Sequence, residues 1–290
     1  MSTSLVCGFI GLGAMGAPMA GHLAAQGLLS VVGNRTVAKA VALAGELNTK
    51  AAQSPRDFAG CNAVFLCVSA DADVMENVSA LADVLTPGSV VVDHSTIARD
   101  TALAAAALLA DRGIAFIDAP VSGGVEGARN GKLSIMCGGD AALLEQVRPA
   151  LACYAARISL MGDIGAGQAT KAVNQVMVAG INEAVCEALA LGAKLGLDAE
   201  TLLPTLASGA ASNWFLDKRG ATMLRGEFVP GFKCAHMLKD LHIVKATAEA
   251  AGVAHPVAQQ ALADYDVLVR EGHGEADTSA LIALKLAGTR

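Results

Sequence analysis

A lysine and three carboxamides recur along one face of an otherwise apolar stretch. Lys171, Asn174, Gln175 and Asn182 fall at i, i+3, i+4 and i+11 of a helical pattern over residues 168–195, so they share a face. Polar groups on a buried helix need partners. The stripe therefore either bonds to neighbouring loops and fixes the helix, or presents an ammonium to a ligand that the amides orient.

The second reading has a definite chemistry. Reduction of an aldehyde needs a hydride and a proton, and the ammonium of Lys171 can both stabilise the developing alkoxide and protonate it. Burial is expected to lower the pKa of Lys171, because desolvation disfavours the charged form. In the oxidising direction the neutral amine would be the base.

A glycine-rich motif lies between the first predicted strand, residues 5–10, and the first predicted helix, residues 17–26. Gly11 permits a tight turn, Gly13 lets a pyrophosphate approach the backbone, and Gly16 lets the helix pack closely. The helix N-terminus then faces the phosphates. We predict a dinucleotide site formed by Gly11, Leu12, Gly13, Ala14, Met15 and Gly16.

The second predicted strand, residues 29–32, indicates which dinucleotide binds. Enzymes that use NAD usually place an acid after this strand to hold the ribose 2′-hydroxyl. Here Asn34, Arg35 and Thr36 follow, and no acid occurs before Glu46. A guanidinium favours a 2′-phosphate, so we predict NADP, with NAD possible. The alternative is that Arg35 is a solvated surface residue.

Further strands at 63–68, 90–93 and 115–117 alternate with helices at 73–85 and 98–112. This alternation predicts a Rossmann-type, doubly wound parallel sheet. Ligands of such sheets lie at the carboxyl ends of the strands, so Val68, Ser69, Ser95 and Thr96 are expected to line the cofactor cleft. Capping of the following helix is the alternative role for Ser95 or Thr96.

A bare loop follows the strand at 115–117. Ser122 and the backbone N–H groups of Gly123 and Gly124 are suited to cradling a carboxylate, although the loop is alternatively a simple turn. From residue 165 onward only helical patterns occur. We predict an NADP-binding α/β domain over 1–163 and an all-α substrate and oligomerisation domain over 164–290. A long interdomain helix would join them, and Lys171 would face the cleft.

Composition narrows the possible partners. Apolar residues make up 53 % of the chain and charged residues 17 %, which predicts extensive burial and a homodimer or homotetramer. The net charge of -6 and the lack of a basic cluster argue against nucleic acid. The best apolar stretch, 173–193, is interrupted by polar and charged residues, so we expect no membrane span.

The seven cysteines are scattered without a C-x-x-C pair, which is typical of reduced thiols in a cytoplasmic protein. No basic segment precedes the first apolar run, so we expect no signal peptide. The six histidines show no metal-ligand spacing, and we predict no metal.

Four separated motifs resemble one enzyme family over nearly the whole chain. They are the segments 8–16 and 118–124, the Gly165-Ala166-Gly167 segment leading to Lys171, and Lys239-Asp240-Leu241. The chain resembles the β-hydroxyacid dehydrogenases, which are short relatives of 6-phosphogluconate dehydrogenase.

The resemblance implies a role for each matched residue. Lys171 would be the catalytic lysine, and Thr96 and Lys239 would contact the cofactor. The loop of Ser122, Gly123 and Gly124 would hold the substrate carboxylate. Many members have Asn-Asn where this chain has Asn174-Gln175, so either amide is a candidate for holding the substrate.

The expected reaction is hydride transfer between NADPH and a small carboxylate-bearing semialdehyde or 3-hydroxy acid, foremost tartronate semialdehyde reduced to glycerate. Other semialdehydes and 3-hydroxyisobutyrate are alternative substrates. An imine reductase is a rival, although those enzymes usually carry Asp or Tyr where Lys171 stands. A non-catalytic dinucleotide-binding protein is another, although it would have no use for a buried ammonium.

Overall fold

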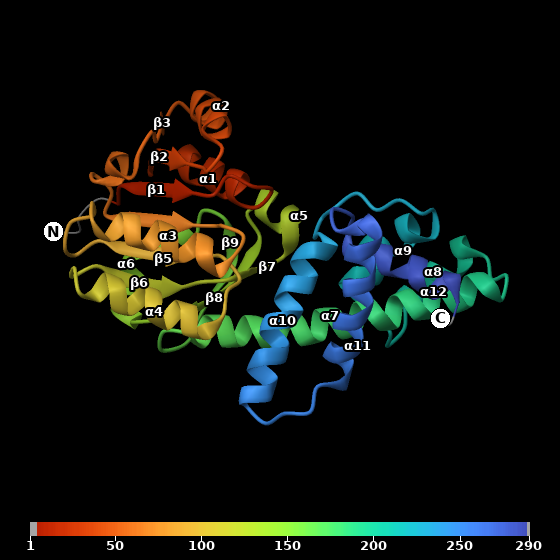
Figure 1. The fold of residues 1–290 in the computed structure, drawn as a ribbon. Helices are drawn as coiled ribbons and strands as arrows, with labels where there is room; N and C mark the ends of the chain where they lie inside the picture. The colour runs from red at the N-terminus through yellow and green to blue at the C-terminus, as the bar shows by residue number, and fades with distance from the viewer. Residues whose placement is uncertain (1–4, 289–290) are drawn as a thin grey trace. The chain divides into compact units, whose positions relative to one another are not determined.

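The computed structural model describes residues 5–288, and these form two compact units that divide between Lys171 and Ala172 (Figure 1). The segment for which the sequence predicts no signal peptide includes residues 1–4, which lie outside the described part. The first unit holds a sheet of nine strands: β1 (Cys7–Ile10), β2 (Leu29–Gly33), β3 (Lys50–Ala51), β4 (Ala63–Leu66), β5 (Val90–Asp93), β6 (Ala115–Asp118), β7 (Val121–Ser122), β8 (Leu133–Gly138) and β9 (Ala155–Gly162).

The strand order is β3-β2-β1-β4-β5-β6-β8-β7, with β9 also paired to β8. Strands β1 to β6 pair in parallel, as predicted, while β8 runs antiparallel to both β6 and β7. The Rossmann-type fold is therefore confirmed, but the sheet is mixed where the chain reverses after β6.

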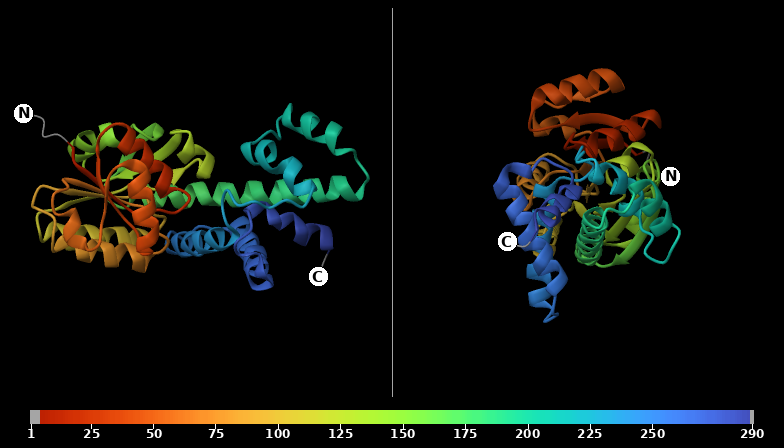
Figure 2. Two further views of the ribbon diagram at one scale, coloured as in Figure 1. Left: turned by 90° about the horizontal axis from the view of Figure 1, so that it is seen from above. Right: turned by 90° about the vertical axis from the view of Figure 1, so that its right-hand side faces the viewer.

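Helices cover both faces of this sheet (Figure 2). They are α1 (Gly16–Ala25), α2 (Val37–Leu47), α3 (Asp71–Ala82), α4 (Arg99–Ala110), α5 (Gly124–Arg129) and α6 (Ala141–Leu151). Successive strand residues point to opposite faces. Phe9 and Phe65 thus join the core under α1 and α6, while Ile10 and Leu66 join the core under α3 and α4.

The second unit is helical, as predicted. Helix α7 (Ala166–Lys194) begins in the first unit and continues into the second, followed by α8 (Ala199–Ala207), α9 (Trp214–Leu224), α10 (Cys234–Ala250), α11 (Pro256–Leu268) and α12 (Leu281–Ala287). In α7 the amide nitrogen of Asn182 donates to the Tyr265 hydroxyl at 3.0 Å, and that hydroxyl donates to the Thr278 carbonyl. The buried Asn182 Oδ1 has no hydrogen-bond partner among residues 5–288.

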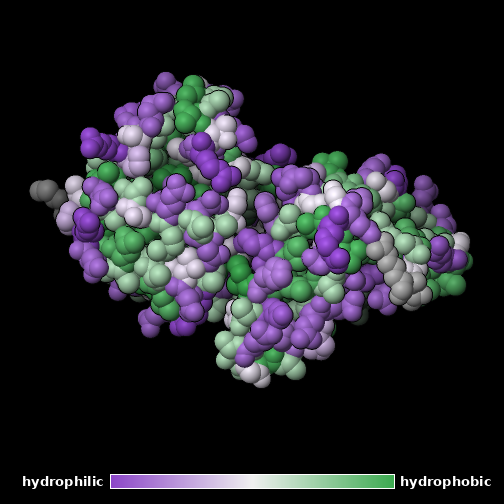
Figure 3. Space-filling view, in the orientation of Figure 1, coloured by the Kyte–Doolittle hydropathy of each residue, from purple (hydrophilic) through white to green (hydrophobic). Residues whose placement is uncertain are grey.

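The polar and charged residues of α7 do not disqualify it from the length and composition test for a membrane span, contrary to the argument from the sequence. By length and composition it is apolar enough to cross a membrane, the one such helix within residues 5–288. Of its qualifying window, 44 % is buried inside the protein, and a core helix passes the same test. Elsewhere, hydrophobic residues reach the visible face of the molecule in scattered groups among hydrophilic ones (Figure 3).

Candidate active site

The glycine motif has the geometry that the sequence predicts. A Cβ atom added to Gly11 would lie 2.2 Å from the Cys67 carbonyl oxygen, and one added to Gly16 would lie 1.8 Å from the Gly11 carbonyl oxygen. Both positions therefore exclude a side chain. At Gly13 no heavy atom lies within 4 Å of the added Cβ. The bare backbone there borders open space that a pyrophosphate can approach.

Helix α1 leaves its positive end available to that ligand. Its N-cap residue, Met15, makes no side-chain capping bond, and the first turn carries no acidic residue. Most helices satisfy these N–H groups with a polar side chain. Here neither a cap nor a carboxylate competes with phosphate, so the residues present fit a dinucleotide. Leu12 is buried in this loop, while Ala14 is exposed.

The residues after β2 have two different roles. Asn34 holds the glycine loop, whereas Arg35 is an exposed cation. Asn34 accepts a hydrogen bond from the Leu12 backbone N–H at 3.0 Å and donates to the Thr36 carbonyl at 3.2 Å, so it ties the glycine loop to the end of β2. The Arg35 side chain is 87 % exposed and lies 3.3 Å from Asp73. Such surface pairs contribute little, so the guanidinium can turn toward an added phosphate.

The ends of β4 and β5 are linked to each other. The Val68 backbone N–H donates to Ser95 Oγ at 2.9 Å. Ser69 is exposed and Thr96 half-buried at these carboxyl ends. The capping alternative for Ser95 and Thr96 is wrong, because the N-cap of α4 is Ala98.

Lys171 and the 118–124 loop come together, although the sequence separates them. The ammonium of Lys171 donates to the Val121 carbonyl at 2.9 Å, and the residue is 8 % exposed. The next residue, Ser122, is half-buried. Gly123 and Gly124 have φ angles of 129° and 61°, a region that favours glycine. A buried cation thus stands beside a loop with bare backbone N–H groups.

Two further residues fix Lys171 in place. Asp118 is fully buried and accepts from the backbone N–H groups of Gly165 at 2.7 Å and Gln168 at 2.8 Å, at the start of α7. Burial raises the pKa of this carboxyl, opposed by the N–H donors. The Gln168 side chain donates to the Ser95 carbonyl and accepts from the Ile97 N–H. Sequence reasoning gave neither residue a role, because their partners are remote in the chain.

His94 holds the backbone at the start of the 118–124 loop. Its Nδ1 lies 2.7 Å from the Ala119 carbonyl, which can only accept, so Nδ1 carries the proton. Nε2 then accepts from the Tyr154 hydroxyl at 2.8 Å. Burial lowers the pKa of His94 to about 4, so the ring is neutral at pH 7.

The amides after Lys171 lie in the second unit. Gln175 is 2 % exposed and donates to Asp240 at 2.7 Å, whereas Asn174 is half-buried. Lys239 lies 2.9 Å from Asp240. Since Asp240 is 3 % exposed, this is not the surface ion pair that its sequence position also allowed.

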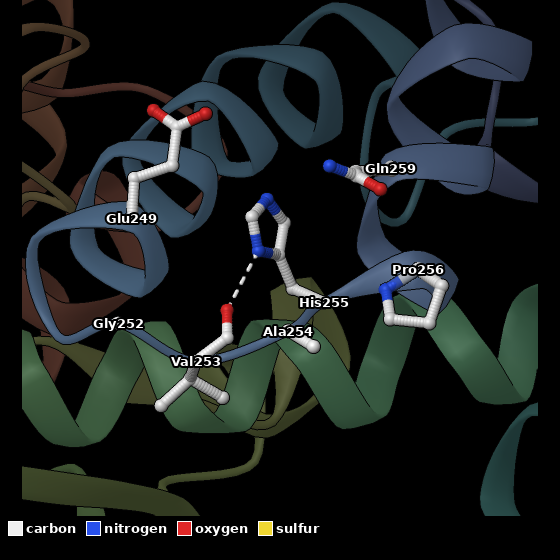
Figure 4. A pocket seen from close by; sticks show the side chains of 7 residues that line it. All are labelled: Glu249, Gly252, Val253, Ala254, His255, Pro256 and Gln259. Atoms are coloured by element: carbon white, nitrogen blue, oxygen red, sulfur yellow. Dashed lines mark hydrogen bonds between the residues drawn. The ribbon is translucent and has the colours of Figure 1, made fainter.

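A separate pocket of about 460 Å³ lies between the end of α10 and the start of α11 (Figure 4). His255 donates to the Val253 carbonyl within it at 3.0 Å. None of the predicted site residues lines it. Within residues 5–288, no group of three or more His, Cys, Asp or Glu side chains could hold a metal ion.

Comparison with known families decides what kind of protein this is. Residues 6–162 match the NAD-binding domain of 6-phosphogluconate dehydrogenase, and residues 165–285 match the NAD-binding domain of NADP-dependent 3-hydroxyisobutyrate dehydrogenase. The chain belongs to the 3-hydroxyisobutyrate dehydrogenase family. It is therefore an NAD(P)-binding oxidoreductase of the β-hydroxyacid dehydrogenase type.

Relatives in this family carry different names. An uncharacterized oxidoreductase of Shewanella frigidimarina is 40 % identical, covering 95 % of this chain and 96 % of its own. The 2-hydroxy-3-oxopropionate reductase of Escherichia coli is 35 % identical, covering 96 % of this chain and 97 % of its own. The NAD-dependent L-serine dehydrogenase of Pseudomonas aeruginosa is also 35 % identical, covering 94 % of this chain and 95 % of its own.

Solved structures agree with the fold. The 3-hydroxyisobutyrate dehydrogenase of Salmonella typhimurium matches with a TM-score of 0.88 at 30 % identity, covering 97 % of this chain and 99 % of that one. Psf3 in complex with NADP+ and 2-OPP matches with a TM-score of 0.88 at 26 % identity, covering 96 % and 99 %.

Proposed function

We propose that this protein transfers hydride between NADPH and a small semialdehyde or 3-hydroxy acid that carries a carboxylate, with Lys171 as the general acid and base. The observation that supports this most directly is the buried ammonium of Lys171, 2.9 Å from the Val121 carbonyl. The substrate reaction that we favour is tartronate semialdehyde to glycerate. The reductase of that name in Escherichia coli is one relative at 35 % identity.

Each part of the site has a task in this proposal. The glycine loop and the N-terminus of α1 bind the pyrophosphate, and Arg35 holds the 2′-phosphate. The reduced nicotinamide supplies the hydride when it is bound. Ser122, Gly123 and Gly124 bind the substrate carboxylate, while Lys171 stabilises the alkoxide oxygen and donates its proton.

The central test replaces the proton donor. Lys171→Met keeps most of the side-chain volume but removes the charge, and we expect kcat to fall by about 10²- to 10⁴-fold. The dissociation constant for NADPH, measured by fluorescence, should stay unchanged. Lys132→Met is the matched control, because Lys132 is an exposed lysine of the same unit. Full activity of Lys171→Met would exclude Lys171 as the acid.

The substrate panel separates the proposal from its alternatives. We expect turnover of carboxylate-bearing semialdehydes and loss of activity on neutral aldehydes of the same length. Equal use of neutral aldehydes would rule out the role of the Ser122 loop. NADPH binding without any turnover would instead favour the non-catalytic alternative, and turnover of cyclic imines would favour an imine reductase.

We also propose a cytoplasmic homodimer or homotetramer. The cysteines are all free thiols in the described part of the chain, in keeping with a reducing compartment. One face of α7, together with Leu195 just after its end, leaves Val173, Met177, Leu191 and Leu195 between 60 % and 66 % exposed. A second copy of the chain would cover them.

A further inference from the structure

The longest strand of the sheet lies at its edge. Strand β9 has eight residues, and among residues 5–288 it pairs with β8 on one side and with no strand on the other. The other outer strands, β3 and β7, have two residues each. Outer strands are usually short, charged or covered, because their unpaired backbone groups recruit another strand. By contrast, β9 carries a single charge, on Arg157, and leaves Leu160 41 % and Met161 46 % exposed.

The unpaired backbone groups of β9 can be located from the bonds of β8. The Met136 N–H donates to the Pro120 carbonyl at 3.0 Å, between β6 and β7 and thus on the side away from β9. The backbone groups of successive strand residues point to opposite sides, so those of Cys137 face β9, where its partner is Leu160. In a parallel ladder a residue bonds to the two residues that flank its partner. Leu160 itself therefore turns its N–H and C=O outward.

This outer edge is complementary to itself in one antiparallel register. With Leu160 opposite the partner's Leu160, the two residues can exchange both backbone hydrogen bonds across a twofold axis. Arg157 then lies opposite the partner's Asp163, and the pair recurs on the other side of the axis, because both residues lie three positions from Leu160. The two side chains are exposed and about 20 Å apart within one chain, at 3.3 Å per residue. They can therefore meet only between copies.

The present surroundings of these two charges leave them available. Arg157 donates to the Ser159 hydroxyl at 3.1 Å, which is a neutral partner on its own strand. Neither Arg157 nor Asp163 takes part in an ion pair within the described part of the chain. Oppositely charged residues directly across an antiparallel pair stabilise it, whereas like charges oppose it.

We propose that β9 is an interface between two copies of this chain, which join antiparallel so that their sheets become continuous, with reciprocal Arg157–Asp163 ion pairs. The charges select this register. A shift of two residues either way would place Arg157 opposite the partner's Met161 or the partner's Gly165.

This inference deepens the proposed assembly. Strand β9 belongs to the first unit, whereas the exposed residues of α7 belong to the second, so the two contacts are separate. Two different twofold interfaces on one chain predict a homotetramer.

Two charge reversals test the pairing. Arg157→Glu places a carboxylate opposite the partner's Asp163, and Asp163→Arg places a guanidinium opposite the partner's Arg157. Each variant alone brings like charges together twice, so we expect light scattering at low ionic strength to give about half the wild-type molar mass. An equimolar mixture of the two variants presents opposite charges at both positions, and we expect it to regain the wild-type mass.

The control is Arg56→Glu, which makes the same change in net charge at an exposed residue between β3 and β4 and should keep the wild-type mass. Recovery on mixing is the decisive result, because mixing cannot repair damage within one chain. An unchanged mass in either variant, or a lowered mass that mixing does not restore, would overturn the inference. A monomeric wild type would refute this inference and the proposed assembly together, whereas an unchanged mass in Met177→Lys would count only against the α7 face.

Discussion

At the scale of single residues, the surroundings of a charged side chain decide whether it can bind a ligand. Arg35 illustrates this, because its side chain is 87 % exposed and only a weak pair with Asp73 holds it. We expect Arg35→Ser to lower kcat/KM for NADPH by about tenfold or more, the loss of one charged hydrogen bond being of order 1.5–3 kcal/mol, and to leave NADH almost unaffected. Arg112→Ser is a close control, since Arg112 forms a similar exposed pair with Asp83 at 3.2 Å. A parallel loss with both cofactors would contradict the assignment.

His94 gives the protein a pH-dependent stability. Its pKa is about 4 in the folded protein and near 6.5 when unfolded. The unfolded chain therefore binds more protons between these values, and stability is lost as the pH falls from 6.5 toward 4. The contribution is about 3 kcal/mol at most. Urea unfolding at pH 7.5 and pH 5 should show a smaller difference for His94→Gln than for the wild type. Equal differences would show that His94 is not the group responsible.

At the scale of elements, the start of α7 sets the position of Lys171, the proposed acid. Asp118→Asn keeps the shape but places an NH₂ group against a backbone N–H, so we expect a loss of about 1–3 kcal/mol of stability. We also expect a fall in kcat, because Lys171 lies one turn further along the helix. Asp140 caps α6 with two backbone N–H bonds in the same way. Asp140→Ala should cost about 1 kcal/mol of stability but leave kcat unchanged. Equal kcat for both variants would show that Asp118 does not position Lys171.

The exposed face of α7 is symmetric in sequence. Val173 and Leu195 lie eleven residues either side of Ala184, and Met177 and Leu191 lie seven either side. An antiparallel second copy would pair large residues at the ends and alanine in the middle. Met177→Lys should therefore lower the molar mass measured by light scattering, while Val41→Lys, at a 51 % exposed position of α2, should not. An unchanged mass would place the interface elsewhere.

For the whole molecule, the periodicity of apolar residues predicted the individual strands and helices, which depend on local sequence. The strands at 90–93 and 115–118 and the helix at 16–25 lie within a residue of their expected bounds, because buried strands and helices have different apolar periods. Helix α5 was missed because Gly123 and Gly124 suggested a bare loop. Helix α2 was missed because it buries little more than Ala40 and Ala44. The antiparallel direction of β8 could not be predicted, because a period-two apolar pattern is the same for parallel and antiparallel strands.

The candidate site was predicted unevenly for the same reason. Sequence motifs brought out Gly13, Lys171 and the Ser122 loop, since each has a chemical meaning of its own. They did not indicate that Asp118 would hold the start of α7 or that Asp240 would orient Gln175. Those roles depend on contacts between residues 47 and 65 positions apart, which no local spacing encodes.

The division between Lys171 and Ala172 has a consequence for how such a protein can diverge. The glycine loop, the Ser122 loop and Lys171 are all encoded in one contiguous stretch, while Asn174, Gln175 and Asp240 are encoded in the next. On the proposed function, mutations in the later stretch would leave the residues proposed for hydride and proton transfer unchanged. Relatives that diverged in this way would share one type of reaction and differ in their substrates.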